Sequence, residues 1–356
     1  MIFEKVIPVN CIPTWRLAIL ATILTAEALT SPARCAAEPF TVMTWNLEWF
    51  YDDAKKDNYS DLAIEKASPS RGQWNWRRDA AATAIAKIAP SVAAVQEIEG
   101  QRVLWYLTRS LERDHKLKYD EFVIQGNDHF TEQDVGLLVR SPVDLFSVMR
   151  GNVTSRMNRD TFGSVSKHVA AFIEVPIGQT TKDQTTETIL IVNVHLRSRD
   201  VGDPIRKKQA ASLNEWINGW TRHAPTTPVI VLGDFNTEQV AENVDPRSEL
   251  AILMSRSTVD PSDDLIDLHD RIPKSGRQTH LLKGKQFDRI LVSRSLVEDT
   301  PNVPDLVLSN VKVRRDVVIR GRGDTPTEHW DDYWGQPDDQ RDLSDHYPVV
   351  AEFEIR

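Results

Sequence analysis

The chain has 356 residues, of which 40% are hydrophobic and 27% charged, a composition that is ordinary for a soluble globular protein. Its formal net charge of −9 argues against a protein that holds nucleic acid by bulk electrostatic attraction, because such proteins are normally basic. The charge does not exclude an enzyme that holds phosphate through a metal ion and a few local cationic side chains.

The first 37 residues have the features of a secretory signal peptide. Lys5 and Arg16 supply positive charge, residues 17–29 form a mostly apolar run, and Ala37 ends a small-residue segment that suits cleavage before Glu38. The apolar run is too short to cross a bilayer. We therefore expect residues 1–37 to be removed and residues 38–356 to be exported as one domain, periplasmic or extracellular. An N-terminal membrane anchor is the alternative.

Both cysteines of the chain, Cys11 and Cys35, fall in this predicted leader. The mature protein would then form no disulfide bond, so its stability must come from its core or from bound ions. A domain of this size can bury a core large enough for that purpose.

After the leader, short apolar runs rich in β-branched residues first alternate with helical patterns and then follow one another. Helices are expected at residues 77–88, 103–114 and 206–220, the first ending before Pro90. This order predicts an α+β protein whose sheets pack together with helices outside. Residues 52–75, 238–276 and 321–340 are interpreted as loops or insertions. The predicted strands are residues 41–47, 92–98, 135–140, 169–175, 189–196, 229–232, 287–292 and 348–353.

Polar side chains stand at the ends of several of these predicted strands. Buried polar atoms need partners, so repeated delivery of such groups by strand ends predicts one shared polar site. Taken singly, each has an ordinary structural explanation, such as a turn-forming Asp or a buried core His. The candidates are Asn46, Glu97, Asn193, His195, Asp234, Asn236, Asp288, Asp345 and His346.

The residue types at this predicted site suit a hard divalent cation. Asn46, Glu97 and Asp345 offer oxygen ligands, which favour Mg²⁺ over Zn²⁺, with Mn²⁺ or Ca²⁺ as alternatives. His195 and His346 can exchange protons near neutral pH. Hydrolysis of a phosphodiester requires a polarising cation, an activated water and stabilisation of the leaving oxygen, and this set can supply all three.

Three blocks of the sequence resemble the endonuclease/exonuclease/phosphatase superfamily, and pancreatic-type DNase I in particular. They are Leu-Gly-Asp-Phe-Asn at 232–236, Phe-Asp-Arg-Ile at 287–290 and Leu-Ser-Asp-His-Tyr-Pro-Val at 343–349, in the family's order. The resemblance extends from residue 41 to residue 355. It implies a four-layer α/β/β/α sandwich of two mostly antiparallel sheets that carries a Mg²⁺-dependent phosphodiesterase.

The resemblance also implies roles for individual residues. Asp234 corresponds to the residue that positions or activates water, Asn236 to a phosphate contact, and Asp288 to the carboxylate that orients the second histidine. Asp134 aligns with the acidic partner of the first histidine. The division of acid and base roles among Asp234, His195 and His346 stays open. In all, the catalytic positions of the family match His195, Asp234, Asn236, Asp288 and His346, and its metal-side positions match Asn46, Glu97 and Asp345.

The chain departs from DNase I where that enzyme contacts DNA. DNase I carries arginines shortly after the early Asn and after the Gln-Glu, and here those places read Leu47-Glu48 and Ile98-Glu99, whose acidic side chains would repel a phosphate backbone. A further arginine of the family is replaced by Lys167 or His168, and the family's disulfides are absent. The resemblance therefore covers the catalytic centre but not the groove-binding surface.

Local basic residues favour a nuclease that cleaves DNA or RNA. Arg197 and Arg199 follow His195 directly and, with the basic residues 206–208, can track a phosphate backbone. A second basic run at residues 71–78 is interleaved with two tryptophans, which either stack on bases or pack in the core. Substrate-binding candidates are thus Asp134, Lys167, Arg197 and Arg199, and no protein partner is inferred.

Three other functions remain open. A sphingomyelinase-type lipid phosphodiesterase, with a lipid headgroup as substrate, would use Trp330, Tyr333 and Trp334 as exposed aromatics at a membrane. A phosphatase for small phosphoesters would share the same core. A non-catalytic binding protein on the same fold would have lost a core group, whereas every core position is filled here.

Overall fold

Two six-stranded β-sheets form the centre of this computed structural model, which describes residues 38–356 apart from 127, 149–167, 180–183, 257, 259 and 260. In the first sheet β1 runs parallel to β2, and every other pair of neighbours is antiparallel. Its strand order is β11 (Leu306–Val313), β12 (Val349–Ile355), β1 (Phe40–Phe50), β2 (Val92–Ile98), β4 (Asp134–Val139) and β3 (Asp120–Ile124).

The second sheet repeats this pattern, with β7 parallel to β8 and the other neighbours antiparallel. The prediction of mostly antiparallel sheets is therefore confirmed. The strand order is β5 (Asp144–Val148), β6 (His168–Gln179), β7 (Gln184–His195), β8 (Val229–Asp234), β10 (Asp288–Val292) and β9 (Ile266–Asp267).

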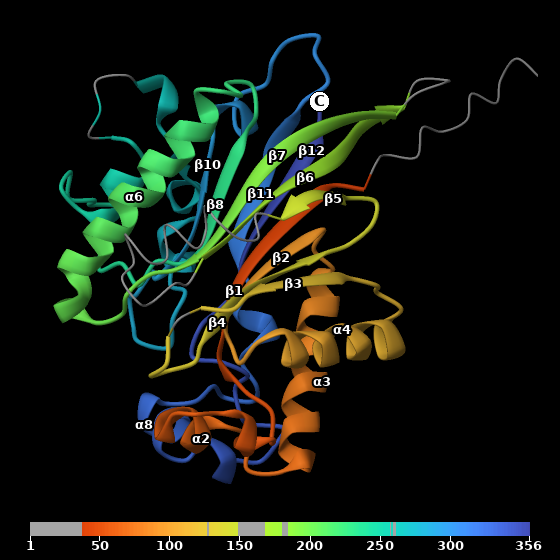
Figure 1. Ribbon diagram of the computed structural model, residues 1–356, viewed down its shortest axis with the longest axis vertical. Helices are drawn as coiled ribbons and strands as arrows, with labels where there is room; N and C mark the ends of the chain where they lie inside the picture. Colours follow the sequence, from red (N-terminus) through yellow and green to blue (C-terminus); the bar gives the residue numbers. More distant parts are fainter. Residues whose placement is uncertain (1–37, 127, 149–167, 180–183, 257, 259–260) are drawn as a thin grey trace, which may run out of the picture. The chain divides into compact units, whose positions relative to one another are not determined.

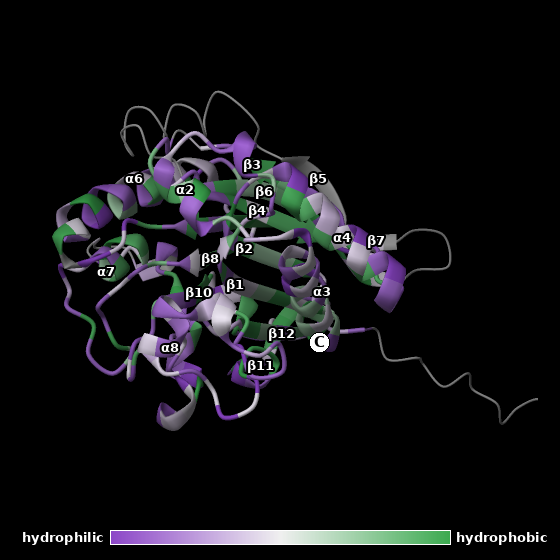
Figure 2. Ribbon diagram, turned by 90° about the horizontal axis from the view of Figure 1, so that it is seen from below, coloured by the Kyte–Doolittle hydropathy of each residue, from purple (hydrophilic) through white to green (hydrophobic). Residues whose placement is uncertain are grey.

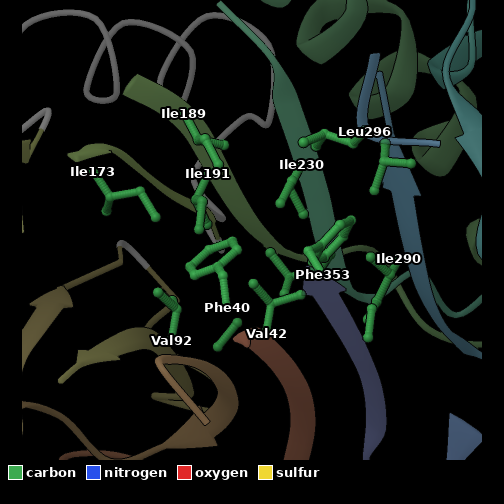
Figure 3. Packing of buried hydrophobic residues seen from close by; sticks show 14 of the residues in the cluster. Phe40, Val42, Val92, Ile173, Ile189, Ile191, Ile230, Ile290, Leu296 and Phe353 are labelled. Atoms are coloured by element: carbon green, nitrogen blue, oxygen red, sulfur yellow. The ribbon is translucent and has the colours of Figure 1, made fainter. Parts of the chain in front are cut away.

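Apolar side chains from both sheets fill the space between them. Figure 3 shows Phe40 on β1 and Phe353 on β12 facing Ile191 on β7 and Ile230 on β8, and all four are at most 4% exposed. The alternation of side chains along a strand sends every second residue into this layer, which is why the predicted strands are so rich in Val and Ile.

Helices cover the outer faces of the two sheets (Figure 1). On the first sheet, α3 (Arg71–Ile88) and α4 (Gln101–His115) pack Ile85, Leu104 and Leu107 against β1 and β2. On the second, α6 (Asp203–Thr221) and α7 (Glu249–Leu253) pack Leu213 and Leu250 against β7 and β8. The predicted four-layer α/β/β/α sandwich is thus confirmed.

The residues from Pro39 to Arg356 form one compact unit. Within the part of the chain that is described, no helix is both long and apolar enough to cross a membrane. For α6, Figure 2 shows hydrophilic residues interspersed with hydrophobic ones along the whole helix, so the helix has no continuous apolar stretch.

The three predicted helices begin two to six residues earlier than the sequence pattern indicated. α3 starts at Arg71, because the Ser70 hydroxyl accepts a hydrogen bond from the Gln73 amide and caps it. α6 starts at Asp203, where Pro204 occupies the first turn without loss of a hydrogen bond. The three predicted loops also contain short helices, namely α2 (Asp61–Lys66), α7 and α8 (Pro326–Asp331).

The four strands that the sequence pattern missed, β3, β5, β9 and β11, are the edge strands of the two sheets. An edge strand has a neighbour on one side only, so it does not need the continuous apolar run of a central strand. β11 illustrates the consequence: Ser309 and Asn310 are exposed and lie where its register with β12 shifts.

Candidate active site

The polar residues singled out in the sequence gather where β1, β2, β7 and β8 end. Because β1 is parallel to β2 and β7 to β8, the carboxyl ends of each pair lie together. His195 and Asp234, the last residues of β7 and β8, are register partners, and Asp288 at the start of β10 is the register partner of Asp234. Figure 2 is viewed from this end and shows β1, β2, β8 and β10 in the middle of the molecule.

Asp234 is the centre of this cluster. The Asn46 amide nitrogen donates to Asp234 Oδ2 and to Glu97 Oε1, both at 3.0 Å. His195 Nε2 lies 3.6 Å from Asp234 Oδ2 and 3.7 Å from Glu97 Oε1. The Asn236 amide nitrogen donates to Asp234 Oδ2 at 3.1 Å. Side chains from three strands and one loop therefore converge on a single carboxylate that is 1% exposed.

His346 approaches Asp234 from the segment before β12. Its Nε2 lies 3.9 Å from Asp234 Oδ2, while its Nδ1 makes a 2.8 Å hydrogen bond with Asp288 Oδ2. The Trp45 indole donates to the His346 carbonyl, and the Ser344 hydroxyl donates to the Asn46 carbonyl. The backbone around His346 is thereby fixed to β1, and Asp288 fixes the ring.

The backbone at this end of the sheets adopts uncommon conformations. Glu97 has φ = 57° and Asn236 has φ = 47°, in the left-handed region that non-glycine residues rarely adopt. Gly233 has φ = 147°, and a Cβ atom there would lie 1.9 Å from the Val194 carbonyl oxygen. Such conformations persist only where the surrounding structure holds them, and they gather at functional sites.

The buried charges of the cluster shift one another's protonation. Burial raises the pKa of the Asp234 carboxyl; the charge of His346 opposes this effect and that of Asp288 adds to it. Burial alone would lower the pKa of His346, but Asp288, Asp234 and Asp345 outweigh it and raise this pKa well above its usual value. His346 is therefore a cation at neutral pH, held between carboxylates.

His280 is a site residue that sequence reasoning missed. Its Nδ1 accepts a hydrogen bond from the Leu282 amide, so the proton resides on Nε2, which lies 3.5 Å from Asp345 Oδ2. Its ring lies 4.7 Å from that of His346. Burial would raise the pKa of Asp345, but the His280 hydrogen bond and the charge of His346 outweigh it and hold the pKa well below its usual range. The one available signal was a histidine eight residues before Asp288.

Glu48 and His329 form a second pair that the sequence did not predict. Glu48 lies near the end of β1, and the segment 321–342 supplies His329. His329 Nε2 makes a 2.6 Å hydrogen bond with Glu48 Oε2, and its Nδ1 makes a 2.8 Å bond with Asp324. Burial lowers the pKa of His329, but Glu48 and Asp324 outweigh it and raise the pKa to about 10. The expectation that Glu48 repels phosphate is therefore corrected, because its charge is compensated by a buried imidazolium.

Glu99, the other acidic departure, lies apart from this cluster. Its Oε2 accepts a hydrogen bond from the Asp52 amide, and burial raises its pKa to about 7. Asp134 lies nearby at the start of β4, where its Oδ1 accepts from the Gly126 amide at 2.7 Å. Both residues line a pocket of about 550 Å³ that includes neither His195 nor Asp234.

The oxygen donors of the cluster fit a hard divalent cation. Asn46 and Glu97 are in direct contact, and Asp345 Oδ1 is a buried oxygen without a hydrogen-bond partner. A buried ionised oxygen without a hydrogen bond is costly unless a cation or water meets it, and the cationic His346 Nε2 lies 3.9 Å from this oxygen. Among the histidines and carboxylates, Asp345 lies close to His280 and His346, and Glu97 lies close to His195 and Asp234.

The predicted basic surfaces are only partly present. Arg197 and Arg199 are exposed in the loop after β7, but Arg206 is 1% exposed and donates to the carbonyls of both. Lys167 lies outside the described residues, and His168 is buried on β6, where desolvation lowers its pKa to about 4.

Of the two alternatives for the run at residues 71–78, the structure supports core packing for Trp74 and Arg77, whereas Arg71 is exposed and pairs with Asp53. Trp74, on the inner face of α3, is fully buried and packs against Phe50 on β1, with ring centroids 5.0 Å apart. Arg77 is 4% exposed and donates to the carbonyls of Leu47 and Trp49. The helical turn points both side chains inward, so neither can meet a polymer.

The aromatics of the segment 321–342 are also less exposed than a membrane contact requires. Tyr333 and Trp334 are half-buried, and the Arg77 guanidinium lies 5.0 Å and 5.7 Å from their ring centroids. Trp330 alone of the three is exposed, at 43%. The expectation of a three-residue lipid-facing element is therefore not met in this arrangement.

Comparison with known proteins gives a consistent result. Residues 43–346 match the sequence profile of the Endonuclease/Exonuclease/phosphatase family. No curated protein matches the chain at a significant level. Among solved structures, it is similar to a mannosyl-6-phosphatase from Bacteroides thetaiotaomicron, at 16% identity and a TM-score of 0.55, over 88% of this chain and 99% of the other.

Two further structures share the fold. The human Nocturnin catalytic domain with bound sulfate is 16% identical, with a TM-score of 0.54 over 90% of this chain and 96% of that one. TDP2 from D. rerio, complexed with single-strand DNA product, is 16% identical, with a TM-score of 0.51 over 89% and 99%. At such identities the likeness is one of fold.

Proposed function

The chain belongs to the endonuclease/exonuclease/phosphatase family, whose members are phosphoester hydrolases, and on that premise we propose that it is a Mg²⁺-dependent phosphodiesterase of the nuclease type. The observation that carries this proposal is the convergence of Asn46, Glu97, His195 and His346 on the buried Asp234 carboxylate. No other part of the described chain combines two histidines with so many hard oxygen donors.

Asp234 is the group that orients and deprotonates the attacking water. Its elevated pKa makes it a better proton acceptor than an exposed aspartate. The water oxygen forms a bond to phosphorus, its proton passes to Asp234, and the ester P–O bond breaks. Hydrogen bonds from Asn46 and Asn236 hold the carboxylate in place during this step.

His346 is the group that protonates the leaving oxygen. It is cationic because Asp288 faces its Nδ1, and its Nε2 lies 3.9 Å from Asp234 Oδ2, beside the proposed position of the scissile phosphate. His195 and Asn236 flank Asp234 and contact the phosphate oxygens. Asn46, Glu97 and Asp345 would hold Mg²⁺, which supplies polarisation of the phosphate and stabilises its developing charge.

A nucleic acid is the proposed substrate, with DNA and RNA both open. Exposed Arg197 and Arg199 directly after His195 support it, because they offer cations to the phosphates beyond the scissile one. We further propose that residues 1–37 are a signal peptide and that residues 38–356 act as the catalytic domain after export. N-terminal sequencing of the secreted protein would give Glu38 as its first residue.

A phosphatase for small phosphoesters is the second candidate. The exposed carboxylates Asp331 and Asp332 line a pocket next to the cluster, and such walls favour a substrate with few phosphates. This candidate is separated from the first by its products, since it releases inorganic phosphate from a sugar phosphate and leaves polymers intact.

The experiment that tests the proposal incubates the mature protein with linear single-stranded DNA, structured RNA, sphingomyelin vesicles and a hexose phosphate, each with Mg²⁺ or with EDTA. Metal-dependent cleavage of DNA or RNA, absent in His346→Ala, is the expected result. Release of phosphocholine alone would replace the nuclease with a lipid phosphodiesterase. Release of phosphate from the sugar alone would establish the second candidate. Inactivity on all four substrates would contradict the hydrolase itself.

A further inference from the structure

A pocket of about 420 Å³ adjoins the catalytic cluster, a volume within the range of small-molecule sites. Its walls come from the end of β1 with Trp49, from α2 with Lys66, and from the segment His329–Gly335, which begins in the last turn of α8. Glu97 and Asp345 line both this pocket and the cluster. If the scissile phosphate lies at Asp234, a group esterified to that phosphate can therefore enter this pocket.

Trp330 stands at the boundary between the pocket and the cluster. Its indole nitrogen donates to Asp345 Oδ2 at 3.0 Å, and its ring lies 6.3 Å from that of His280. The side chain is nevertheless 43% exposed, although it is fixed at one end. An aromatic ring that is held by a hydrogen bond yet open to solvent offers a preformed surface for stacking at little entropic cost.

The charges of the pocket limit what it can accept. Asp331 and Asp332 are exposed and add to Glu97 and Asp345, whereas His329 compensates the charge of Glu48 and Lys66 pairs with Glu65. Arg77 is occupied by main-chain carbonyls and by the rings of Tyr333 and Trp334. A strand of phosphates would meet uncompensated carboxylates here, so an uncharged group is favoured over a polyanion.

We propose that this pocket binds the terminal nucleoside of an unpaired nucleic-acid strand, and that the enzyme therefore cleaves at strand ends. The inference rests on the proposed nuclease function and deepens it. A nucleobase stacks on an exposed indole irrespective of sequence. The exposed carboxylates of Asp331 and Asp332 are acceptors for the exocyclic amino groups of bases.

The arrangement divides the substrate at the scissile phosphate. The terminal nucleoside lies against Trp330, and the remaining phosphates extend past Arg197 and Arg199, which are exposed on the side of His195. Water adds to the phosphorus between them, one ester P–O bond breaks, and the leaving oxygen takes a proton. Each turnover thus removes one terminal unit from the strand, and a base within a duplex cannot enter the pocket.

The test compares linear and circular single-stranded DNA of one sequence in the presence of Mg²⁺. We expect the linear strand to shorten by one unit at a time and the circle, which has no end, to persist. Equal rates on the two would overturn the terminal subsite while leaving the hydrolase proposal intact. Failure to cleave either strand or any other phosphoester would instead contradict the proposed function, and the two failures are thus distinct.

Variants of Trp330 test the stacking surface itself. Trp330→Ala is expected to raise KM for the linear strand about tenfold to a hundredfold, the effect of one lost base stack, with a smaller change in kcat. Trp330→Phe keeps a ring but loses the donor to Asp345, so it should recover most of the affinity. Trp105→Ala, which removes a tryptophan of 44% exposure on α4, is the matched control.

If Trp330→Phe is as impaired as Trp330→Ala, the residue acts only through its hydrogen bond to Asp345, and the subsite is overturned. An unchanged KM in Trp330→Ala would overturn it as well. The terminal subsite is supported if KM rises in Trp330→Ala but not in Trp330→Phe or Trp105→Ala, and if the circular strand is not cleaved.

Discussion

Gln96 on β2 and Asn193 on β7 are joined by a 2.7 Å hydrogen bond that crosses from one sheet to the other. Asn193 also donates to the carbonyls of Val95 and Gly136, and both side chains are fully buried. Glu97 follows Gln96 directly, and His195 follows Asn193 after one residue. This bridge therefore sets the spacing between the two sheets immediately behind the catalytic cluster.

Replacement of Asn193 by leucine should destabilise the protein by about 1–3 kcal/mol, because buried acceptors on β2 and β4 lose their donors. Urea unfolding followed by circular dichroism measures the change. Asn310→Leu on the exposed edge of β11 is the matched control and should stay within about 0.5 kcal/mol of wild type. Equal stability of Asn193→Leu and wild type would show that the bridge contributes nothing.

Gly233→Ala should be among the most damaging single substitutions in the chain. The added methyl group would overlap the Val194 carbonyl at 1.9 Å and would force β7 and β8 apart beside His195 and Asp234. We expect a loss of about 3 kcal/mol or more, seen as a lower Tm or a loss of soluble protein. Gly219→Ala on α6, where no atom lies within 4 Å of the new Cβ, should be neutral or slightly stabilising.

Asp288→Asn keeps the shape of the side chain but removes the charge that faces His346 Nδ1. The amide neither holds the ring as a cation nor fixes its tautomer, so kcat should fall on the order of 10³-fold or more, as for other carboxylates that orient a catalytic histidine. Steady-state kinetics measures it on whichever substrate the assay of the four phosphoesters identifies, with exposed Asp299→Asn as control. A kcat near that of wild type would remove Asp288 from the mechanism.

Glu97→Gln should raise the Mg²⁺ concentration that gives half-maximal activity by about tenfold or more, because a charged hard ligand becomes a neutral one. The measurement is a titration of activity against Mg²⁺ after removal of metal with EDTA. Glu99→Gln, two residues further along and outside the cluster, should leave the titration unchanged. A metal titration identical in the two variants would count against the assignment of Glu97.

The stability contributed by His329 should depend on pH. Its pKa is raised in the folded state, to about 10, so the favourable pairing with Glu48 and Asp324 is fully present below the unfolded pKa of about 6.5. It is lost as the pH rises through 10. The Tm advantage of wild type over His329→Gln should therefore be largest at pH 6 and should shrink between pH 7 and pH 10. An advantage that is constant over this range would refute the pairing.

Much of the fold could be predicted because its signals are local. Central strands such as Val92–Ile98 are largely buried on both faces and begin with an apolar run, here residues 92–95, whereas the edge strands β3, β5, β9 and β11 lack a comparable signal and were missed. The candidate site was predictable for a related reason: a polar residue that ends a buried strand, such as Asp234, has few structural explanations when several strands repeat the pattern.

By itself, the sequence determined the family-like catalytic blocks, the polar residues at the ends of the central strands and the alternation of strands and helices, each of which follows from residues close together along the chain. Only the tertiary structure decided what those residues meet. The pairing of Glu48 with His329 spans 281 positions, and Trp74 and Arg77 turn inward because α3 packs on β1 through that face. The burial and the hydrogen-bond partners of a side chain depend on which distant segments pack together. The periodicity of one segment indicates its apolar face but does not identify the segment that packs on it.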